Sequence, residues 1–259
     1  MDLKTEFEQL VGASGLVTDA QALEPHLTEW RGLFRGQAPL LVMPADVGEA
    51  SAVLAFCQRH GIGVVPQGGN TGLAGGAIPF STAERPQIIV SLARMRAIRE
   101  LDAENYTITA EAGCLLATVQ AAAAAADRLF PLSLSAEGSC QLGGNLSTNA
   151  GGINVLRYGN ARDLVLGLEV VLADGRVLPM LRALRKDNTG YDLKHLFIGA
   201  EGTLGLITAA TCKLFPQPVS VATAMVALPG PADAVRLYGE ARGMLGDELV
   251  SCELINRLG

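Results

Sequence analysis

The sequence predicts an α+β protein, and three features of the 259-residue chain lead to that prediction. A buried strand, an amphipathic helix and a second strand follow one another over residues 39–67, which is the pattern of a β-α-β unit. A series of short strands then runs from residue 88 to residue 215, with a helix predicted at 115–126 between them. Finally, Pro216-Gln217-Pro218 marks a boundary at which this pattern ends.

Composition excludes several classes of protein. Apolar residues make up 49% of the chain, which is enough for a sizeable core, and the formal net charge of −6 argues against a nucleic-acid surface. The five scattered cysteines form no C-x-x-C pair, so neither a disulfide framework nor a zinc site is expected. The acidic N-terminus predicts neither a secretory signal nor a transit peptide, and no run approaches the roughly 18 apolar residues of a membrane span. We therefore expect a soluble, cytoplasmic protein.

Residues 1–38 are expected to form a short helix and an irregular lead-in. Apolar residues recur at helical spacing over residues 3–11, which predicts the helix. The irregular part contains the single tryptophan, Trp30, which either packs inside a loop or forms part of a ligand wall. Packing is the simpler interpretation.

The β-α-β unit begins with a buried strand at residues 40–43. Asp46 and Glu49 then form a capping-box pattern that starts a helix running to about Arg59. His60 stands at the C-terminal end of that helix, where a cation complements the helix dipole, and we favour this role over catalysis.

The first glycine cluster, residues 68–76, follows the second strand of this unit. Five of its nine residues are glycine, and glycine allows positive φ angles and lets backbone N–H groups converge on an anion. No Gly-Lys-[Ser/Thr] follows, and the spacing is not a G-x-G-x-x-G that opens a helix, so neither common phosphate motif is present. The cluster is therefore either a phosphate loop that relies on its own amides or a glycine-rich surface loop.

The second glycine cluster, residues 137–152, follows strands predicted at 88–92, 97–101 and 106–111. It mixes glycine with small hydroxyl and amide side chains and holds almost no charge. Such a surface approaches a flat polar ligand closely and offers it hydrogen bonds. Two clusters in one chain indicate an extended ligand that is contacted at both ends.

Downstream, a strand at residues 164–172 turns back at Asp174-Gly175, a hairpin signal. A short helix is expected near 189–197 and a closing strand at 202–215. His195, in the short helix, is either a general base or a surface residue, and its charged neighbour Lys194 favours the surface.

Past the boundary at Pro218, a strand, a helix and a strand are predicted at 219–228, 231–245 and 249–254. This unit has too little core to be a stable domain. We expect it to be the start of a second domain whose remainder lies beyond Gly259.

Several motifs together resemble a known family. They are Pro66-Gln67-Gly68-Gly69-Asn70-Thr71-Gly72, Gly138-Ser139-Cys140, Gly143-Gly144-Asn145, Thr148-Asn149-Ala150-Gly151-Gly152, Leu156-Arg157-Tyr158-Gly159 and the segments 166–175, 185–194 and 196–205. With them the chain resembles the FAD-dependent 2-hydroxyacid dehydrogenases of the vanillyl-alcohol-oxidase (PCMH-type) superfamily. Within that superfamily it is most similar to the D-2-hydroxyglutarate and D-lactate dehydrogenases.

The resemblance implies a PCMH-type FAD-binding domain over residues 39–218, with subdomains at about 39–100 and 101–218, followed by an incomplete substrate (cap) domain at 219–259. It implies that FAD lies extended between the subdomains. The implied pyrophosphate contacts are Gln67, Gly68, Gly69, Asn70, Thr71 and Gly72, completed by Gly76 and Ala77. The implied contacts of the ribityl chain and flavin ring are Ser139, Gly144, Asn145, Thr148, Asn149, Gly151 and Gly152, with Ile207 from the closing strand. No histidine lies beside the first cluster, so FAD is expected to be non-covalent.

The chemistry that the resemblance implies is oxidation of a D-2-hydroxyacid, D-2-hydroxyglutarate or D-lactate, to the 2-oxoacid by hydride transfer to flavin N5. His26, His60 and His195 do not match the family's base or metal ligands, which are expected beyond Gly259. The chain is thus expected to bind FAD, to hold no metal and to lack turnover by itself. The electron acceptor is open, and a homodimer is compatible with the family. Alternatives are a glycolate dehydrogenase subunit, a non-catalytic flavin-binding subunit that works with a partner, and a glycine-rich α/β protein without a cofactor.

Overall fold

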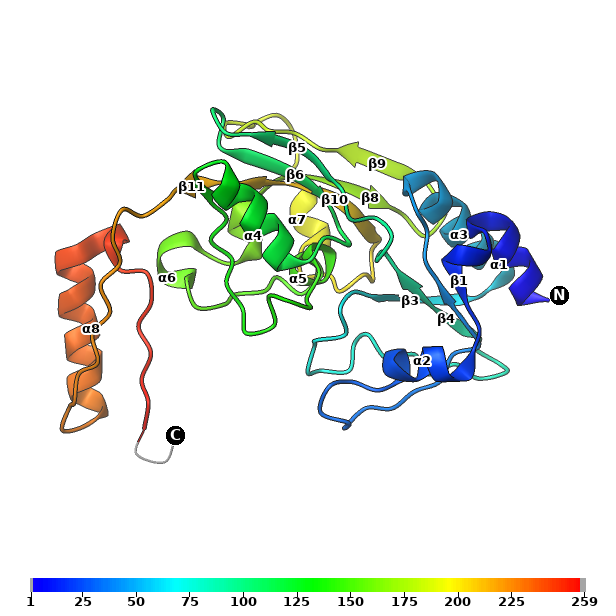
Figure 1. The fold of residues 1–259 in the computed structure, drawn as a ribbon, viewed down its shortest axis with the longest axis horizontal. Coiled ribbons are helices and arrows are strands. Elements are labelled where there is room, and N and C mark those ends of the chain that lie inside the picture. The colour runs from blue at the N-terminus through cyan, green and yellow to red at the C-terminus, as the bar shows by residue number, and fades with distance from the viewer. Residues whose placement is uncertain (1, 257–259) are drawn as a thin grey trace.

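Two β-sheets and the helices that cover them make up most of the molecule, and helix α8 (Pro231–Leu245) stands at the end far from the N-terminus (Figure 1). The structure is a computed structural model that describes residues 2–256. Met1 and the last three residues of the predicted segment 219–259 lie outside the described residues. The mixture of helix and sheet confirms the predicted α+β class.

The first sheet has four strands in the order β1-β2-β4-β3. Its last three strands run parallel, and β1 pairs with β2 in the antiparallel direction. Parallel strands require a crossover connection, and α3 provides it between β2 and β3, which lie on either side of β4. The strands are β1 (Leu16–Val17), β2 (Leu41–Val42), β3 (Gly63–Gln67) and β4 (Gln87–Ser91).

Helix α3 (Val47–His60) confirms the predicted β-α-β unit. The carboxylate of Asp46 caps it by accepting a 2.9 Å hydrogen bond from the N–H of Glu49. Gly61 ends it at φ 65°, a left-handed conformation that glycine adopts without strain. His60 is its last residue, as expected. The first glycine cluster follows β3 directly.

The second sheet has five antiparallel strands in the order β5-β6-β10-β8-β9. The predicted turn at Asp174-Gly175 joins β8 to β9, with Gly175 at φ 87°. Helices α4 and α5 lie on the same face of this sheet (Figure 1). The elements are β5 (Ile98–Asp102), β6 (Thr107–Glu111), β8 (Val165–Val171), β9 (Val177–Met180), β10 (Leu206–Lys213), α4 (Leu116–Ala125) and α5 (Leu142–Ser147).

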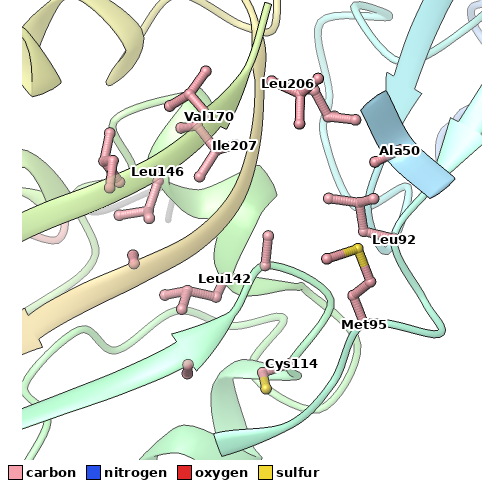
Figure 2. Close-up of a cluster of buried hydrophobic side chains, with 14 of the residues drawn as sticks. Ala50, Leu92, Met95, Cys114, Leu142, Leu146, Val170, Leu206 and Ile207 are labelled. Carbon is pink, nitrogen blue, oxygen red and sulfur yellow. The ribbon is translucent and has the colours of Figure 1, made fainter. Parts of the chain in front are cut away.

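One hydrophobic core joins the two sheets. Figure 2 shows Leu142 of α5 and Ile207 of β10 in the same cluster as Met95, which follows the first sheet. Helix α3 also reaches the second sheet, where the Ser51 hydroxyl donates a 2.5 Å hydrogen bond to the carbonyl of Gly175. Because packed cores deform little, this shared core fixes the positions of the two glycine clusters relative to each other.

The N-terminal lead-in is more regular than predicted. Helix α1 (Leu3–Val11) has the expected bounds, but the stretch before Pro39, predicted to be irregular, contains β1 and a second helix, α2 (Ala20–Leu27). The carboxylate of Asp19 caps α2 with a 2.9 Å hydrogen bond from the N–H of Ala22. Pro25 lies inside α2. Proline lacks a backbone donor and disfavours a helix interior, so the sequence did not predict a helix here.

The predicted strands after Pro218 are wrong. Helix α8 forms as expected, but within the described residues neither 219–228 nor 249–254 pairs as a strand. Val219 and Met225 are 104% and 93% exposed, and no residue of α8 is buried. Strand propensity depends on a packed neighbour, which this segment does not have here. This C-terminal segment contacts the part of the chain before Pro218 through an ion pair of Glu248 with Arg157, at 3.1 Å.

No helix among residues 2–256 is both long and apolar enough to cross a membrane.

Short elements complete the chain. The short elements are η1 (Ala13–Gly15), β7 (Arg128–Leu129), α6 (Val155–Tyr158), η2 (Ala161–Leu164), α7 (Lys194–Phe197), β11 (Phe215–Pro216) and η3 (Gly246–Glu248).

All five cysteines are free, and four of them are buried. Burial raises the pKa of Cys57 and Cys212 to about 12 and that of Cys114 to about 11. Burial also raises the pKa of Cys140, whereas Cys252 is exposed.

We expect one thiol of the folded protein, Cys252, to react quickly with a disulfide reagent at pH 8, because the thiolate is the reactive species and the other thiols are buried and protonated. All five should react after denaturation. Absorbance of the released thiolate measures the count, and Cys252→Ser should abolish the fast phase. Two fast thiols in the native protein would contradict this assignment.

Candidate functional site

The two glycine clusters, far apart in the sequence, touch each other. A β-carbon placed on Gly69 would lie 1.9 Å from the carbonyl oxygen of Ser139. One placed on Gly68 would lie 3.5 Å from the side chain of Gln141 and 3.8 Å from the α-carbon of Gly144. The loop after β3 and the segment around α5 therefore form adjoining walls of one surface.

Unpaired backbone donors are the main chemical feature of the first cluster. Within residues 2–256, no N–H from residue 69 to residue 77 donates a hydrogen bond to the protein. Gly69, Gly72 and Gly76 are exposed. A series of free N–H groups on a glycine-rich loop can bind an anion with several oxygen atoms.

The Gln67 side chain joins the two ends of this loop from beneath. It is 3% exposed, and its Nε2 donates hydrogen bonds of 2.9 Å to the carbonyls of Ala77 and His26. Its Oε1 lies 2.5 Å from Nδ1 of His26. Both polar ends of the side chain are thus hydrogen-bonded within the protein, and the predicted contact of Gln67 with a ligand stays a prediction.

Asn70 anchors the middle of the loop. Its backbone is left-handed, with φ 52°, a conformation that asparagine tolerates better than most residues. Its Nδ2 donates hydrogen bonds of 3.1 Å and 2.9 Å to the carbonyls of Pro25 and Thr28. The Arg31 guanidinium adds a third tie by donating to the carbonyl of Leu73.

The loop at residues 29–34 lies beside the first cluster. The buried carboxylate of Glu29 accepts 2.7 Å hydrogen bonds from the N–H groups of Arg31 and Leu33. The bond from Arg31 is the main cause that holds the pKa of Glu29 below its usual value. The expected packing of Trp30 is wrong, because its side chain is 79% exposed at the tip of this tight turn.

The second cluster is a helix with flanking turns. Helix α5 begins where the N–H groups of Leu142 and Gly143 donate 2.9 Å and 2.8 Å hydrogen bonds to the carbonyls of Cys114 and Ala112. Gly152 has φ 82°, and a β-carbon there would lie 2.1 Å from the carbonyl oxygen of Ser133. Only glycine fits that position.

Several predicted contact residues have roles inside the protein. Asn145 is 4% exposed and donates to Sγ of Cys140 at 3.5 Å. The Thr148 hydroxyl donates to the carbonyl of Gly144 at 2.9 Å, and Oδ1 of Asn149 accepts a 2.9 Å hydrogen bond from the N–H of Arg162.

The remaining predicted contacts differ in exposure. The Ser139 hydroxyl is on an exposed residue, whereas Ile207 is 3% exposed within the core. Contact of all the predicted residues with a ligand stays a prediction.

The structure adds a third wall that the predicted site leaves out, residues 199–202. The N–H groups of Gly199 and Glu201 donate 3.1 Å and 2.9 Å hydrogen bonds to the carbonyls of Leu146 and Ser147, which dock this segment on α5. Glu201 has φ 51°, and its Oε2 lies 3.0 Å from the β-carbon position of Gly76. The sequence signal was present, because Gly199, Gly202 and Gly205 repeat the glycine density of the two clusters.

His195 lies on the surface, as favoured by the sequence. It is exposed, and its Nδ1 lies 3.6 Å from a carboxylate oxygen of Asp192. Partial burial is the first cause that lowers the pKa of His195. No group of three or more His, Cys, Asp or Glu side chains suited to a metal ion occurs among residues 2–256.

Comparisons with known proteins bear on this site. The family profile described as "FAD binding domain" matches residues 38–180. A probable D-2-hydroxyglutarate dehydrogenase of Oryza sativa subsp. indica is 43% identical over 251 residues, covering 97% of this chain and 44% of the relative. The D-2-hydroxyglutarate dehydrogenase of Bos taurus is 43% identical over 241 residues, with 93% and 44% covered. The chain thus spans less than half the length of these relatives.

Solved structures agree on the fold. An alkyldihydroxyacetonephosphate synthase matches with a TM-score of 0.79 at 21% identity, covering 93% of this chain and 45% of that one. This likeness concerns the fold alone.

The expected cytoplasmic location is contradicted, because the rice and cattle relatives are both named as mitochondrial proteins.

We expect Gly69→Ala to destabilise the folded protein by about 1–3 kcal/mol, because the added methyl group would force the two clusters apart. The β-carbon position of Gly72 has no atom within 4 Å, so Gly72→Ala is the matched control. It should change the unfolding free energy by less than about 0.5 kcal/mol. Chemical denaturation measures both, and equal stability of the two variants would disprove the close contact.

Proposed function

This chain belongs to the FAD-binding domain family (PCMH type), and we propose that its two glycine clusters hold the FAD of a D-2-hydroxyacid dehydrogenase. The observation that carries the proposal is the uninterrupted series of unpaired N–H groups from residue 69 to residue 77, set against the second cluster.

The residues at the site fit such a dinucleotide. A pyrophosphate has several anionic oxygens, and the free amides of the first cluster can donate to them without a lysine. The β-carbon positions of Gly72, Gly138 and Gly144 meet no atom within 4 Å, so a ligand can approach the backbone at all three. The exposed Ser139 and Thr148 supply hydroxyl groups for the remainder of the ligand.

The chain holds FAD without a covalent bond in this proposal. The cysteine nearest to the contact between the clusters, Cys140, is 3% exposed and accepts a hydrogen bond from Asn145. No histidine occurs in the sequence of either cluster. The fold brings His26 to the base of the first cluster, where its Nδ1 faces Oε1 of Gln67 at 2.5 Å. When bound, FAD would supply the hydride acceptor for oxidation of the substrate.

We propose D-2-hydroxyglutarate as the substrate of the whole enzyme, since both relatives described above carry that name. D-lactate and glycolate remain alternative substrates, and a non-catalytic flavin-binding subunit that works with a partner remains an alternative role. The electron acceptor stays open, and a homodimer stays a prediction.

We expect the purified chain to bind one FAD and to be yellow, with fluorescence of the single tryptophan, Trp30, quenched on binding. Gly72→Glu should weaken FAD at least about tenfold, because it adds a carboxylate to the anion-binding loop. Gly243→Glu on α8 adds the same charge at another open position and should leave the affinity unchanged. A chain that binds no FAD would refute the proposed function.

We expect acid precipitation to leave the yellow colour in the supernatant, because FAD is not tethered. Colour retained in the washed protein pellet would disprove the non-covalent site. The control is a free FAD solution carried through the same precipitation with an unrelated protein.

We expect the FAD-loaded chain alone not to be reduced by D-2-hydroxyglutarate or D-lactate under anaerobic conditions, because none of the residues that we propose for the site is assigned as the catalytic base. Flavin absorbance measures reduction, and dithionite serves as the positive control. Bleaching by either hydroxyacid would show that the catalytic groups lie within this chain.

A further inference from the structure

The N-terminal segment 19–36 lies outside the matched family region of residues 38–180, yet it holds the first glycine cluster in place. We propose that His26 in this segment is a positioning residue for the cofactor loop, acting through Gln67. The inference rests on the proposed function, because it deepens the description of the same FAD site.

The hydrogen bonds of Gln67 determine its orientation and the proton position on His26. The two carbonyls near Nε2, those of His26 and Ala77, only accept hydrogen bonds, so the amide NH₂ must face them. Oε1 then faces Nδ1 of His26 at 2.5 Å. Since Oε1 only accepts, Nδ1 of His26 must carry the proton and donate it.

This contact closes the base of the loop. Gln67 is the last residue of β3, and its side chain reaches Ala77 at the other end of the series of unpaired amides. His26 completes the set of partners of Gln67 at a buried position. Without the histidine donor, Oε1 would be buried and unpaired, which favours another orientation of the amide and loss of its bond to Ala77.

Two further ties connect the same segment to the loop. Nδ2 of Asn70 donates to the carbonyls of Pro25 and Thr28, and Arg31 donates to the carbonyl of Leu73. The segment thus contacts the start and the middle of the loop directly, and its end through Gln67. A loop that is ordered before binding does not lose that conformational freedom when the ligand binds, so its affinity is higher.

The side chains themselves are used inside the protein. Gln67 and Asn70 donate to backbone carbonyls of this chain and leave the N–H groups of residues 69–77 to the cofactor. A change at His26 should therefore act on FAD affinity through the shape of the loop, without removal of a group that contacts FAD.

The test measures FAD affinity and the thermal midpoint of the cofactor-free protein for a set of variants of the full chain. His26→Leu removes the donor to Gln67, whereas His26→Asn retains an N–H group close to the position of Nδ1. His60→Leu removes the exposed histidine at the end of α3. Arg94→Met removes hydrogen bonds of 3.1 Å and 2.8 Å to the carbonyls of Val11 and Met43, and serves as the control for lost stability alone.

We expect His26→Leu to weaken FAD binding about tenfold or more, and His26→Asn to restore it to within about threefold of the unmodified chain. His60→Leu should leave affinity unchanged. Arg94→Met should lower the thermal midpoint and leave affinity within about twofold. Rescue by asparagine separates positioning from a general loss of structure.

The inference is overturned if His26→Leu binds FAD as tightly as the unmodified chain, or if Arg94→Met weakens FAD equally. If His26→Leu does not fold, His26→Ala decides, because alanine also removes the donor to Oε1 of Gln67. Weaker FAD binding by His26→Ala supports the inference and unchanged binding overturns it. If the unmodified chain binds no FAD, both the proposed function and this inference are disproved. If it binds FAD and the His26 variants bind it equally tightly, only the inference is disproved.

Discussion

The close backbone approach of Gly69 to Ser139 is the constraint on which the site depends. The space between them is too small for a single methyl group, since a β-carbon at Gly69 would lie 1.9 Å from the carbonyl oxygen. This contact brings the loop after β3, which belongs to the first sheet, against the segment around α5, which covers the second. Glycine at residue 69 is therefore needed for packing, in addition to the conformational freedom that glycine gives a loop.

The shared hydrophobic core makes that approach reproducible. Leu142 of α5 and Met95 after the first sheet lie in one cluster (Figure 2). Helix α3 also reaches the turn that contains Gly175, through the hydroxyl of Ser51. Neither sheet could shift relative to the other without opening space between buried side chains, which costs both dispersion contacts and buried area. The position of the two glycine clusters relative to each other thus follows from the packing of the hydrophobic core that the two sheets share.

The side chains and the backbone of the site have separate tasks. Gln67, Asn70 and Asn145 are hydrogen-bonded inside the chain, where they hold the loop and α5 in shape. The donors left for a ligand are mainly backbone N–H groups, which no substitution other than one to proline removes. A site built in this way recognises anionic oxygens through geometry, and its sequence signature is glycine together with small amides that support the loop.

The sequence by itself determined the elements whose signals are local. The capping carboxylate of Asp46, the Asp174-Gly175 turn and the glycine density after β3 depend on near neighbours, so they could be recognised without the fold. Only the tertiary structure showed that residues 25–31 contact the first glycine cluster and that residues 199–202 dock on α5, because these contacts join distant parts of the chain. It also showed that residues 219–228 do not form the predicted strand, because this segment has no neighbouring strand to pair with among the described residues. Local chemistry specifies turns and caps, whereas long-range pairing and burial require the whole chain to be packed.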